Sequence, residues 1–415
     1  MKTGPNIVTD DSVFGYDTGY PSADNETSLR FNKGEPVTNL FTTVGDASNV
    51  DQNVTFSVNG TGTFKRVAVG TEIGNYKVKE TDVVYSYELG TTGCHYHGND
   101  YSSVSSGTKV SFSIEYFLTS DVSIVSNYLG NFEQLSGVGG SWGDVNSQTG
   151  VWHKVSFTRT ATSTGNLRML MYPGACSGTY LSAQGTIYYK NPTVTLTEHN
   201  VPFVSGTRSS TQSLIDLKKT TDIDVSNTSF DSNAQITFDG TDDKINGNWP
   251  SSLNSDDNTT PRSWEVVLKT TSTGRQGVFG HKSATGCSYY CNGGIFLYGG
   301  NVTFNWYDNS SYQFLSGGSV TTNKYMHVVG TFDGSTGDAI PRIYVNGELK
   351  ATYGSSTNLN YSSGMNIYDI GWNSKNGGTD YFSGEIPIVK YYKDKALSLS
   401  EIKQNYNAYK NRFGI

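Results

Sequence analysis

The fold is decided by KYMHVVGTFDG (Lys324–Gly334) and by RIYVNGEL (Arg342–Leu349), which follows it. The first segment alternates large and small side chains, which is typical of a half-buried antiparallel strand. In the second, Asn346-Gly347 lies between two apolar-alternating runs and predicts a type I′ hairpin turn, because such a turn needs two positive φ angles. The last third of the chain is therefore predicted to be an antiparallel β-domain.

Three further motifs follow in order: DIGW (Asp369–Trp372), FSGEI (Phe382–Ile386) and ALSLSEI (Ala396–Ile402). In the last, Ser398 or Ser400 can cap a short helix whose positive end is favoured by Glu401. This order of motifs resembles the laminin-G-like, concanavalin A-type jelly roll family over about 203–415. The resemblance implies a two-sheet sandwich, and members of the family mostly bind glycans or proteins, while a minority hydrolyse polysaccharides. Residues 401–414 also resemble the end of such domains in structural proteins of tailed bacteriophages.

The composition favours strands. The 415 residues include 47 Gly and 28 Tyr, and only 16% are charged, which is typical of an all-β protein with many turns. A chain of this length is too long for one compact sandwich and suits two domains plus an extension.

Charge and hydropathy bear on the partners. The net charge is −7 and no run of Lys or Arg occurs, so nucleic acid is not expected as a partner, because phosphate binding needs clustered cations. No segment approaches the about 18 consecutive apolar residues of a membrane helix, so membrane insertion is not expected. The first ten residues lack the apolar segment of a secretory signal. A mature secreted protein could have lost its signal. Otherwise this lack is awkward for a secreted bacterial protein, whereas it is natural for a virion component.

Turn residues and alternating runs divide the chain into four parts. Residues 1–45 are predicted to be an extended docking arm, because Gly, Pro and Asp interrupt them every few residues. The apolar side chains of the arm must dock on a partner or on the chain's own domains. Residues 46–200 are predicted to be one jelly roll, 201–230 a connector, and 231–415 a second jelly roll that ends in a short helix. The predicted fold class is all-β, with two tandem antiparallel sandwiches.

The first jelly roll is predicted from six short runs with apolar residues at every second position, which favours a sandwich over βαβ units. Two segments, WHKVSF (Trp152–Phe157) and KNP (Lys190–Pro192), resemble carbohydrate-binding-module jelly rolls. The junction segments PFVSGTR (Pro202–Arg208) and LIDL (Leu214–Leu217) resemble those before such domains in phage proteins.

Catalysis is not predicted. Retaining glycanases of this fold resemble one another in a Glu-x-Asp-x-x-Glu strand, which directs carboxylates into one cleft. Only Asp222-Ile223-Asp224 approaches that spacing, without a completing acidic residue, and Glu265 lies in what is predicted to be an ordinary buried strand. Carboxylates from separate strands stay open as an alternative.

The four cysteines allow two intradomain disulfides, Cys94 with Cys176 and Cys287 with Cys291, formed after release into an oxidising medium. Free thiols are the alternative for a chain assembled in a reducing cytoplasm. The segment CHYH (Cys94–His97) with Cys176 also offers zinc-ligand types, but zinc sites show cleaner paired spacing, so the disulfide is favoured.

Calcium is the cofactor that the sequence leaves open, since both sandwich families often carry it. Loop Asp residues are also common simply because they tolerate turns, and calcium needs several converging oxygens. The candidate ligands are Asp239, Asp242, Asp243, Asp256 and Asp257.

Aromatic residues in polar loops are the best candidates for ligand binding. A Trp or Tyr among Gly, Asn and Asp can stack on a sugar while its neighbours bond the hydroxyl groups. Packing in the core or between subunits is the competing explanation; it suits Trp152 and Trp264 better and is balanced for Trp142 and Trp372. The glycan-binding candidates are Trp142 and Asp144; Trp306, Tyr307, Asp308 and Tyr312; and Trp372, Asn373, Asp380 and Tyr381.

These features predict a non-enzymatic structural protein on the virion surface of a tailed bacteriophage, as a head decoration or a short tail appendage or fibre. We expect assembly in the host cytoplasm, attachment to other virion proteins through the arm, and weak, multivalent binding to cell-surface or extracellular glycans. A homo-oligomer is expected, with a trimer as one arrangement. The alternatives are a secreted or cell-surface bacterial lectin or adhesin and, less favoured, a polysaccharide hydrolase.

Overall fold

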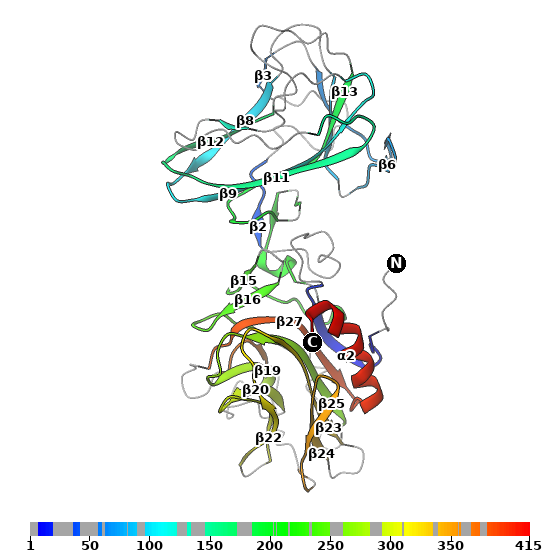
Figure 1. The fold of residues 1–415 in the computed structure, drawn as a ribbon, viewed down its shortest axis with the longest axis vertical. Coiled ribbons are helices and arrows are strands. Elements are labelled where there is room, and N and C mark those ends of the chain that lie inside the picture. The colour runs from blue at the N-terminus through cyan, green and yellow to red at the C-terminus, as the bar shows by residue number, and fades with distance from the viewer. Residues whose placement is uncertain are drawn as a thin grey trace. The chain divides into compact units, whose positions relative to one another are not determined.

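The computed structural model divides the chain into two compact units (Figure 1). The inserted unit comprises Val37–Arg208, and the C-terminal unit combines Met1–Pro36 with Ser209–Ile415. The structure describes residues 7–19, 36–41, 57–59, 63–80, 82–88, 96–122, 131–133, 146–171, 185–201, 203–204, 206–214, 216–231, 235–249, 260–282, 293–308, 311–334, 339–355, 357, 367–373 and 380–415. No helix in these ranges is long and apolar enough to cross a membrane.

The C-terminal unit is a sandwich of two antiparallel sheets. The eight-stranded sheet has the order β15-β16-β27-β18-β23-β24-β25, with β1 also paired to β27, and the six-stranded sheet has the order β17-β26-β19-β20-β21-β22. The bounds in the first sheet are β1 Ser12–Asp17, β15 Ser229–Phe230, β16 Ile236–Asp239, β18 Arg262–Thr270, β23 Tyr325–Asp333, β24 Ile340–Val345, β25 Glu348–Thr352 and β27 Ser383–Lys393. Those in the second are β17 Ile245–Asn248, β19 Gln276–Lys282, β20 Gly294–Tyr298, β21 Asn301–Tyr307, β22 Tyr312–Ser319 and β26 Ile367–Ile370.

Strand alternation builds the core between these sheets. In β18, Trp264, Val266 and Leu268 belong to the main hydrophobic cluster, and the Trp264 ring lies 5.4 Å from that of Phe304 in β21. Each fully buried side chain of this size contributes about 1.5–3 kcal/mol. The intervening residues of β18 must therefore point to the outer side of the eight-stranded sheet.

The segments that decide the fold form β23, β24 and β25. Asn346 and Gly347 connect β24 to β25 with φ angles of 51° and 77°, so the predicted turn with two positive φ angles is confirmed. The prediction of a half-buried β23 is wrong, because its residues from Met326 to Phe332 are all buried. A helix covers the outer side of this strand.

That helix is α2 (Leu399–Phe413), the predicted short C-terminal helix. Ser398 is its N-cap: the Ser398 side chain accepts from the Glu401 backbone N–H, and the Glu401 carboxylate accepts from the Ser398 N–H at 2.9 Å. This reciprocal capping confirms the predicted helix start at Ser398. The helix packs on the outer side of the eight-stranded sheet through Ile402, Tyr409 and Phe413.

Part of the predicted docking arm is a strand of the C-terminal unit. Strand β1 pairs with β27, and its Phe14 and Tyr16 side chains are fully buried. Figure 1 shows this blue strand beside the red helix α2, where Arg412 donates to the Asp17 carboxylate at 2.8 Å. Of the two docking partners that the sequence allowed, residues 12–17 therefore use the chain's own domain.

The inserted unit also contains two antiparallel sheets, ordered β11-β9-β13-β7-β4 and β10-β12-β8-β3, and a β5–β6 hairpin. Val110, Phe112, Ile114 and Tyr116 of β9 all enter its hydrophobic cluster, as their alternation predicted. The bounds are β3 Ser57–Asn59, β4 Thr63–Arg66, β5 Glu72–Ile73, β6 Tyr76–Lys77, β7 Val84–Glu88, β8 Tyr96–Val104, β9 Lys109–Leu118, β10 Asn131–Glu133, β11 Trp152–Thr160, β12 Gly165–Met171 and β13 Thr186–Thr195.

The ends of the inserted unit pair with each other. Strand β2 (Val37–Thr38) is antiparallel to β14 (Thr207–Arg208), and the short 3-10 helix η1 (Ser210–Gln212) follows. The chain order differs from the expected tandem arrangement, because β1 precedes this unit yet belongs to the C-terminal sandwich.

Candidate functional site

Two of the three predicted aromatic loops lie on the outer side of the six-stranded sheet. Tyr307, Asp308 and Tyr312 lie where β21 meets β22, and Trp372, Asn373, Asp380 and Tyr381 lie between β26 and β27. We call this surface the aromatic face and define it by the rings of Tyr298, Tyr307, Tyr312, Phe314, Trp372 and Tyr381.

Alternation directs the rings of β21 and β22 outward. Val302, Phe304 and Trp306 of β21 enter the core, so the next residue, Tyr307, points to the other side. Tyr307 pairs with Tyr312 across the two strands, and their ring centres lie 4.9 Å apart. Tyr312 and Phe314, two residues apart in β22, are 38% and 54% exposed.

Tyr298 at the end of β20 completes this group. Its side chain is 50% exposed and its ring centre lies 6.2 Å from that of Phe314. Neither residue was predicted. The sequence contained a signal for each residue. Phe314 stands two positions after Tyr312 and so points to the same side of the strand, and Tyr298 directly precedes the Gly299-Gly300 turn.

Arg275 links the loop that contains Trp372 and Asp380 to Tyr298 on β20. Its guanidinium carbon lies 5.7 Å from the ring centre of Tyr298 and 5.6 Å from that of Phe296, within the range of a cation–π contact. Its Nε lies 3.1 Å from Oδ2 of Asp380. A residue of the predicted second loop is thereby linked to an aromatic residue that the sequence analysis missed.

The second loop can lie close to the sheet only because residue 277 is glycine. A Cβ on Gly277 would lie 2.5 Å from the carbonyl carbon of Trp372 and 2.7 Å from the backbone N of Asn373. The Gly277 N–H donates to the Asp380 carbonyl at 2.9 Å. These backbone contacts fix both ends of the loop on β19.

Trp372 has two neighbours on this face. Its ring stacks near Tyr381, with centres 6.0 Å apart and an interplanar angle of 22°. The Lys244 ammonium lies 4.4 Å from the Trp372 ring centre. Among the described aromatic residues of this face, Phe314, Tyr298 and Tyr312 have the largest exposed fractions.

Two polar atoms on this side lack a hydrogen-bond partner among the described residues: Oδ1 of Asn305 and Nδ2 of Asn373. Asn305 pairs with Phe314 in the β21–β22 ladder, and the Asn373 side chain is only 2% exposed. Buried polar atoms normally find a partner, but both atoms are closed to solvent, and therefore to a ligand, in this structure.

Trp306 corrects the prediction for its loop. The Trp306 side chain is fully buried, packs beside Phe304 and Tyr353, and its Nε1 donates to Oγ1 of Thr357 at 3.3 Å. It cannot stack on a glycan. Val302, Phe304 and Trp306 occupy every second position of the strand, and this alternation in the sequence indicated that Trp306 is buried.

Several predicted residues lie outside the described ranges. They are Trp142 and Asp144, the cysteines Cys94, Cys176, Cys287 and Cys291, and the calcium candidates Asp256 and Asp257.

The remaining calcium candidates, Asp239, Asp242 and Asp243, lie in the turn between β16 and β17. Carboxylate oxygens of the three lie within 4.8 Å of one another. Burial and the charges of Asp239 and Asp242 raise the pKa of Asp243 to about 6. A divalent cation would relieve this repulsion, but with one oxygen from each carboxylate the group supplies only about half of the 6–8 oxygens that calcium takes, and backbone carbonyls or waters would have to supply the rest. Backbone N–H bonds to Asp239 Oδ1 also account for the turn itself.

Residues 225–403 match a family model, Laminin_G_3, of the concanavalin A-like lectin/glucanases superfamily. Over the matched residues the C-terminal unit has the two-sheet jelly-roll fold that the resemblance implied. A search of curated proteins found no significant match to the chain.

Solved structures similar to this chain include a heptameric SAP-like pentraxin from Limulus polyphemus, at 17% identity and TM-score 0.31, covering 40% of this chain and 78% of that one. The binding region of botulinum neurotoxin type C, in a study of ganglioside-dependent cell entry, is 14% identical with TM-score 0.38 and covers 48% of this chain and 49% of that chain. The CBM40 of Ruminococcus gnavus IT-sialidase bound to α2,3-sialyllactose is 17% identical with TM-score 0.31 and covers 37% and 84%.

Because that superfamily contains glucanases, the fully buried carboxylate Glu265 of the jelly roll is relevant. Its oxygens accept from His327 Nε2 and the Tyr392 hydroxyl at 2.8 Å each and from Asn405 Nδ2 at 2.9 and 3.1 Å. Lys390 Nζ lies 4.0 Å away. Glu265 is therefore buried as predicted, but it organises a polar network under α2 instead of belonging to an ordinary apolar strand, and it is closed to a polysaccharide.

The network explains the ionisation of Glu265. Burial by itself raises the pKa of this carboxyl, but Lys390, His327 and Tyr392 outweigh burial and lower the pKa to about 2. Val8 joins the same network, since its N–H donates to Asn405 Oδ1 at 2.7 Å and its carbonyl accepts from the Tyr392 hydroxyl at 2.9 Å. Glu265 thus stabilises the contact among the sheet, α2 and the N-terminal segment.

Proposed function

We propose that the C-terminal jelly roll binds an extended glycan across its aromatic face and does not cleave it. The observation that carries this proposal is the exposure of Tyr298, Tyr312 and Phe314 on one side of one sheet, at 50%, 38% and 54%. Scattered exposed apolar side chains are ordinary, but aromatic rings grouped on one surface are typical of a binding site. Ring faces can stack on the apolar face of a pyranose.

The extent of the face favours an oligosaccharide over a single sugar. From Trp372, beyond the end of β26, to Phe314 on β22 the face crosses β26, β19, β20, β21 and β22. Five adjacent strands at about 4.8 Å spacing span roughly 20 Å. A linear chain of several sugar units would reach from one group of rings to the other.

The polar groups of the face suit hydroxyl-rich ligands. Sugar hydroxyls donate and accept, and the Arg275–Asp380 ion pair places a donor group and an acceptor group on this face. Ligand sites typically combine aromatic walls with a few such polar groups. The match of residues 225–403 to a superfamily of lectins and glucanases supports the same ligand class.

A glycan array with the purified chain tests the proposal. We expect binding to at least one polysaccharide class and a loss of about fivefold or more in the variants Tyr298→Ala and Phe314→Ala, since one lost stacking contact corresponds to roughly 1 kcal/mol. Leu349→Ala is the matched control, because Leu349 is 47% exposed on the other sheet. Binding that is absent, or unchanged in both aromatic variants, contradicts the proposal. Release of reducing sugar from the bound polysaccharide would make the protein a hydrolase instead.

We further propose that this jelly roll is displayed on the virion of a tailed bacteriophage, as a head decoration or short tail appendage in several copies. The support is the resemblance of residues 401–414 and of the 202–217 junction to phage structural proteins. Many copies would convert weak glycan contacts into avidity. Mass spectrometry of purified particles should find the chain; particles without it would overturn the virion role and leave glycan binding untouched.

A further inference from the structure

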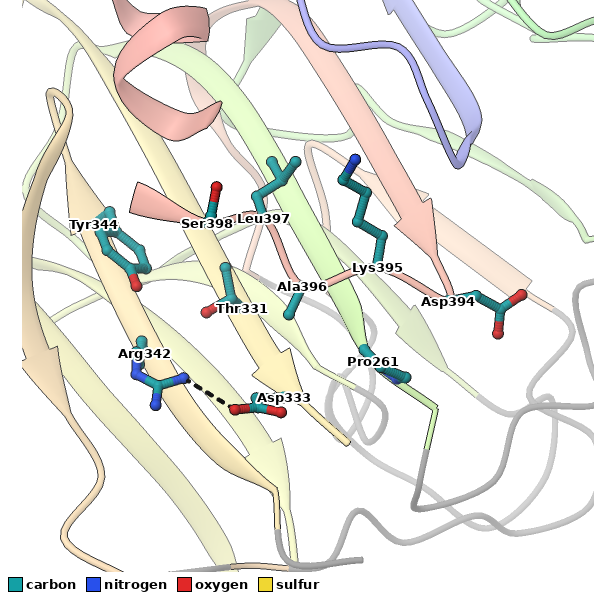
Figure 2. Close-up of a pocket in the computed structure, with 10 residues that line it drawn as sticks. All are labelled: Pro261, Thr331, Asp333, Arg342, Tyr344, Asp394, Lys395, Ala396, Leu397 and Ser398. Atoms are coloured by element: carbon teal, nitrogen blue, oxygen red, sulfur yellow. Dashed lines mark ion pairs between the residues drawn. The ribbon is translucent and has the colours of Figure 1, made fainter. Parts of the chain in front are cut away.

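A cavity of about 450 Å³ lies on the outer side of the eight-stranded sheet, away from the aromatic face (Figure 2). It is bounded by β23 and β24 and by the connector Asp394–Ser398, which joins β27 to α2. Its volume falls within the range of small-molecule sites. Neither the sequence motifs nor the aromatic face accounts for it.

The cavity is held open by hydrogen bonds from the sheet. Oγ of Ser263 in β18 donates to the Lys395 carbonyl at 3.0 Å and accepts from the Leu397 N–H at 2.8 Å. On the opposite side, Thr331 and Arg342 are directly paired residues of β23 and β24. Both walls are therefore fixed by strands before any ligand arrives, which lowers the entropic cost of binding.

Polar groups line the cavity on the side of β23 and β24. Figure 2 shows the hydroxyl groups of Thr331 and Tyr344 beside the space and the Arg342–Asp333 ion pair at one end. The Ser398 hydroxyl is turned to α2, which it caps. Burial raises the pKa of Tyr344, while Arg342 and a hydrogen bond with Thr331 act in the opposite direction. Pro261, Ala396 and Leu397 supply the apolar part of the lining.

The ion pair at the end of the cavity is loose. Nη1 of Arg342 lies 3.6 Å from Oδ2 of Asp333 and 3.5 Å from the Ile340 carbonyl, both long for hydrogen bonds. The guanidinium can therefore exchange these contacts for shorter ones to a ligand. Two adjacent hydroxyl groups could then donate to Asp333 and accept from Arg342 at the same time.

The charges of the lining disfavour an anion. The two cationic side chains, Arg342 and Lys395, are balanced by the two carboxylates of Asp333 and Asp394. Lys395 is also committed to Glu401 at 2.8 Å. A phosphate or sulfate group would meet as much negative as positive charge, whereas an uncharged, hydroxyl-rich molecule meets matching donors and acceptors.

We propose that this cavity is a second carbohydrate site, which binds one neutral sugar residue through Arg342, Asp333 and Thr331. The site is separate from the aromatic face, because it lies on the other sheet and shares no residue with it. One jelly roll would then hold two glycans, or two parts of one glycan, and gain affinity through the linkage.

The test uses the full chain with Phe314→Ala, so that the aromatic face is weakened, and a panel of methyl glycosides of neutral hexoses and N-acetylhexosamines. We expect at least one glycoside to cause saturable shifts of the backbone amide signals of Thr331, Arg342 and Ala396. Arg342→Ala and Asp333→Asn should each weaken that binding about tenfold, as for hydrogen bonds to charged groups. Lys350→Ala is the control, because Lys350 pairs with exposed Glu348 on neighbouring β25 and does not line the cavity.

Three results would overturn the second site: no saturable shift with any glycoside, shifts that persist unchanged in both cavity variants, or a stronger response to inorganic phosphate than to every sugar. If Arg342→Ala does not fold, Asp333→Asn decides the question, because it keeps the shape of the side chain. None of these outcomes depends on glycan binding at the aromatic face.

Discussion

The outer sides of the two sheets of the jelly roll show the same strand alternation, but one side is largely covered and the other is partly exposed. On the eight-stranded sheet, α2 and Val8 cover the outward residues, and Glu265, His327 and Tyr392 form a buried network there. On the six-stranded sheet, outward residues such as Tyr298 and Phe314 are half exposed. We call the part of the first side that α2 and Val8 cover the closed face; the cavity of the proposed second site lies beside it on the same sheet.

This difference shows that strand alternation predicts which side chains point away from the core but not whether they are exposed to solvent. On the closed face, the oxygens of Glu265 accept hydrogen bonds from His327, Tyr392 and Asn405, although Nδ1 of His327 lacks a partner among the described residues. The aromatic face instead leaves the side chains of Tyr298 and Phe314 half exposed. Stability and glycan binding are therefore expected to separate between the closed face and the aromatic face.

The largest effect on stability is expected from deleting Met1–Gly19, because this deletion removes β1 from the eight-stranded sheet. The deletion removes the buried side chains of Phe14 and Tyr16 and exposes the edge of β27, so the C-terminal unit should not fold stably. The milder Phe14→Ala should lower the free energy of unfolding by about 3–5 kcal/mol in urea titrations. Val69→Ala, at a site 56% exposed, is the control. An unchanged midpoint for the deletion would mean that the arm docks on a partner instead, which is the other possibility that the sequence left open.

The next effect is expected from Glu265→Ala. It leaves Lys390 and His327 buried without their carboxylate, which should cost about 3–5 kcal/mol in the free energy of unfolding. Glu348→Ala, which removes a carboxylate that is 71% exposed on the same sheet, should leave the free energy of unfolding nearly unchanged. Equal effects of the two substitutions would show that the buried network adds no more stability than an exposed carboxylate does.

The loss of stability at acidic pH should depend on the protonation of Glu265. Its pKa is lowered from 4.5 to about 2 in the folded chain, so the unfolded chain binds more protons between these values. The stabilisation from this carboxylate is complete above about pH 4.5 and is lost as the pH falls towards 2. Glu265→Gln should flatten this part of the pH profile in urea titrations. Parallel profiles for the two proteins would mean that another group controls acid unfolding.

The smallest effect on stability is expected on the aromatic face. Tyr298→Ala and Phe314→Ala should change the free energy of unfolding by no more than about 0.5 kcal/mol, because both side chains are half exposed. Their glycan affinity should nevertheless fall. A destabilisation as large as that of Glu265→Ala would show that these rings serve packing.

Local chemistry made much of this fold predictable. The positive φ angles of Asn346 and Gly347 and the cap at Ser398 depend on neighbours within a few residues, and both predictions are confirmed. The loops with Tyr312 and Trp372 were singled out because aromatic residues stand among polar ones. Trp306 was wrongly predicted to bind a glycan, although its position two residues after Phe304 indicated that it points into the core.

The closed face could not be predicted, because its contacts are distant in sequence. Glu265 meets Asn405 140 residues later, and Val8 meets the same Asn405 across 397 residues. No local pattern distinguishes a strand covered by a helix from one that is open on its outer side. Tyr298 and Phe314 were missed for a related reason, since their proximity depends on the pairing of three strands.

The most direct test of the central claim is hydrogen-exchange mass spectrometry of the chain with and without a polysaccharide that it binds, using Arg342→Ala so that the cavity on the other sheet does not contribute. The account predicts protection of peptides from 294–319 and from 367–382, with no change in α2. Protection confined to α2 or to the inserted unit would contradict the aromatic face as the glycan site.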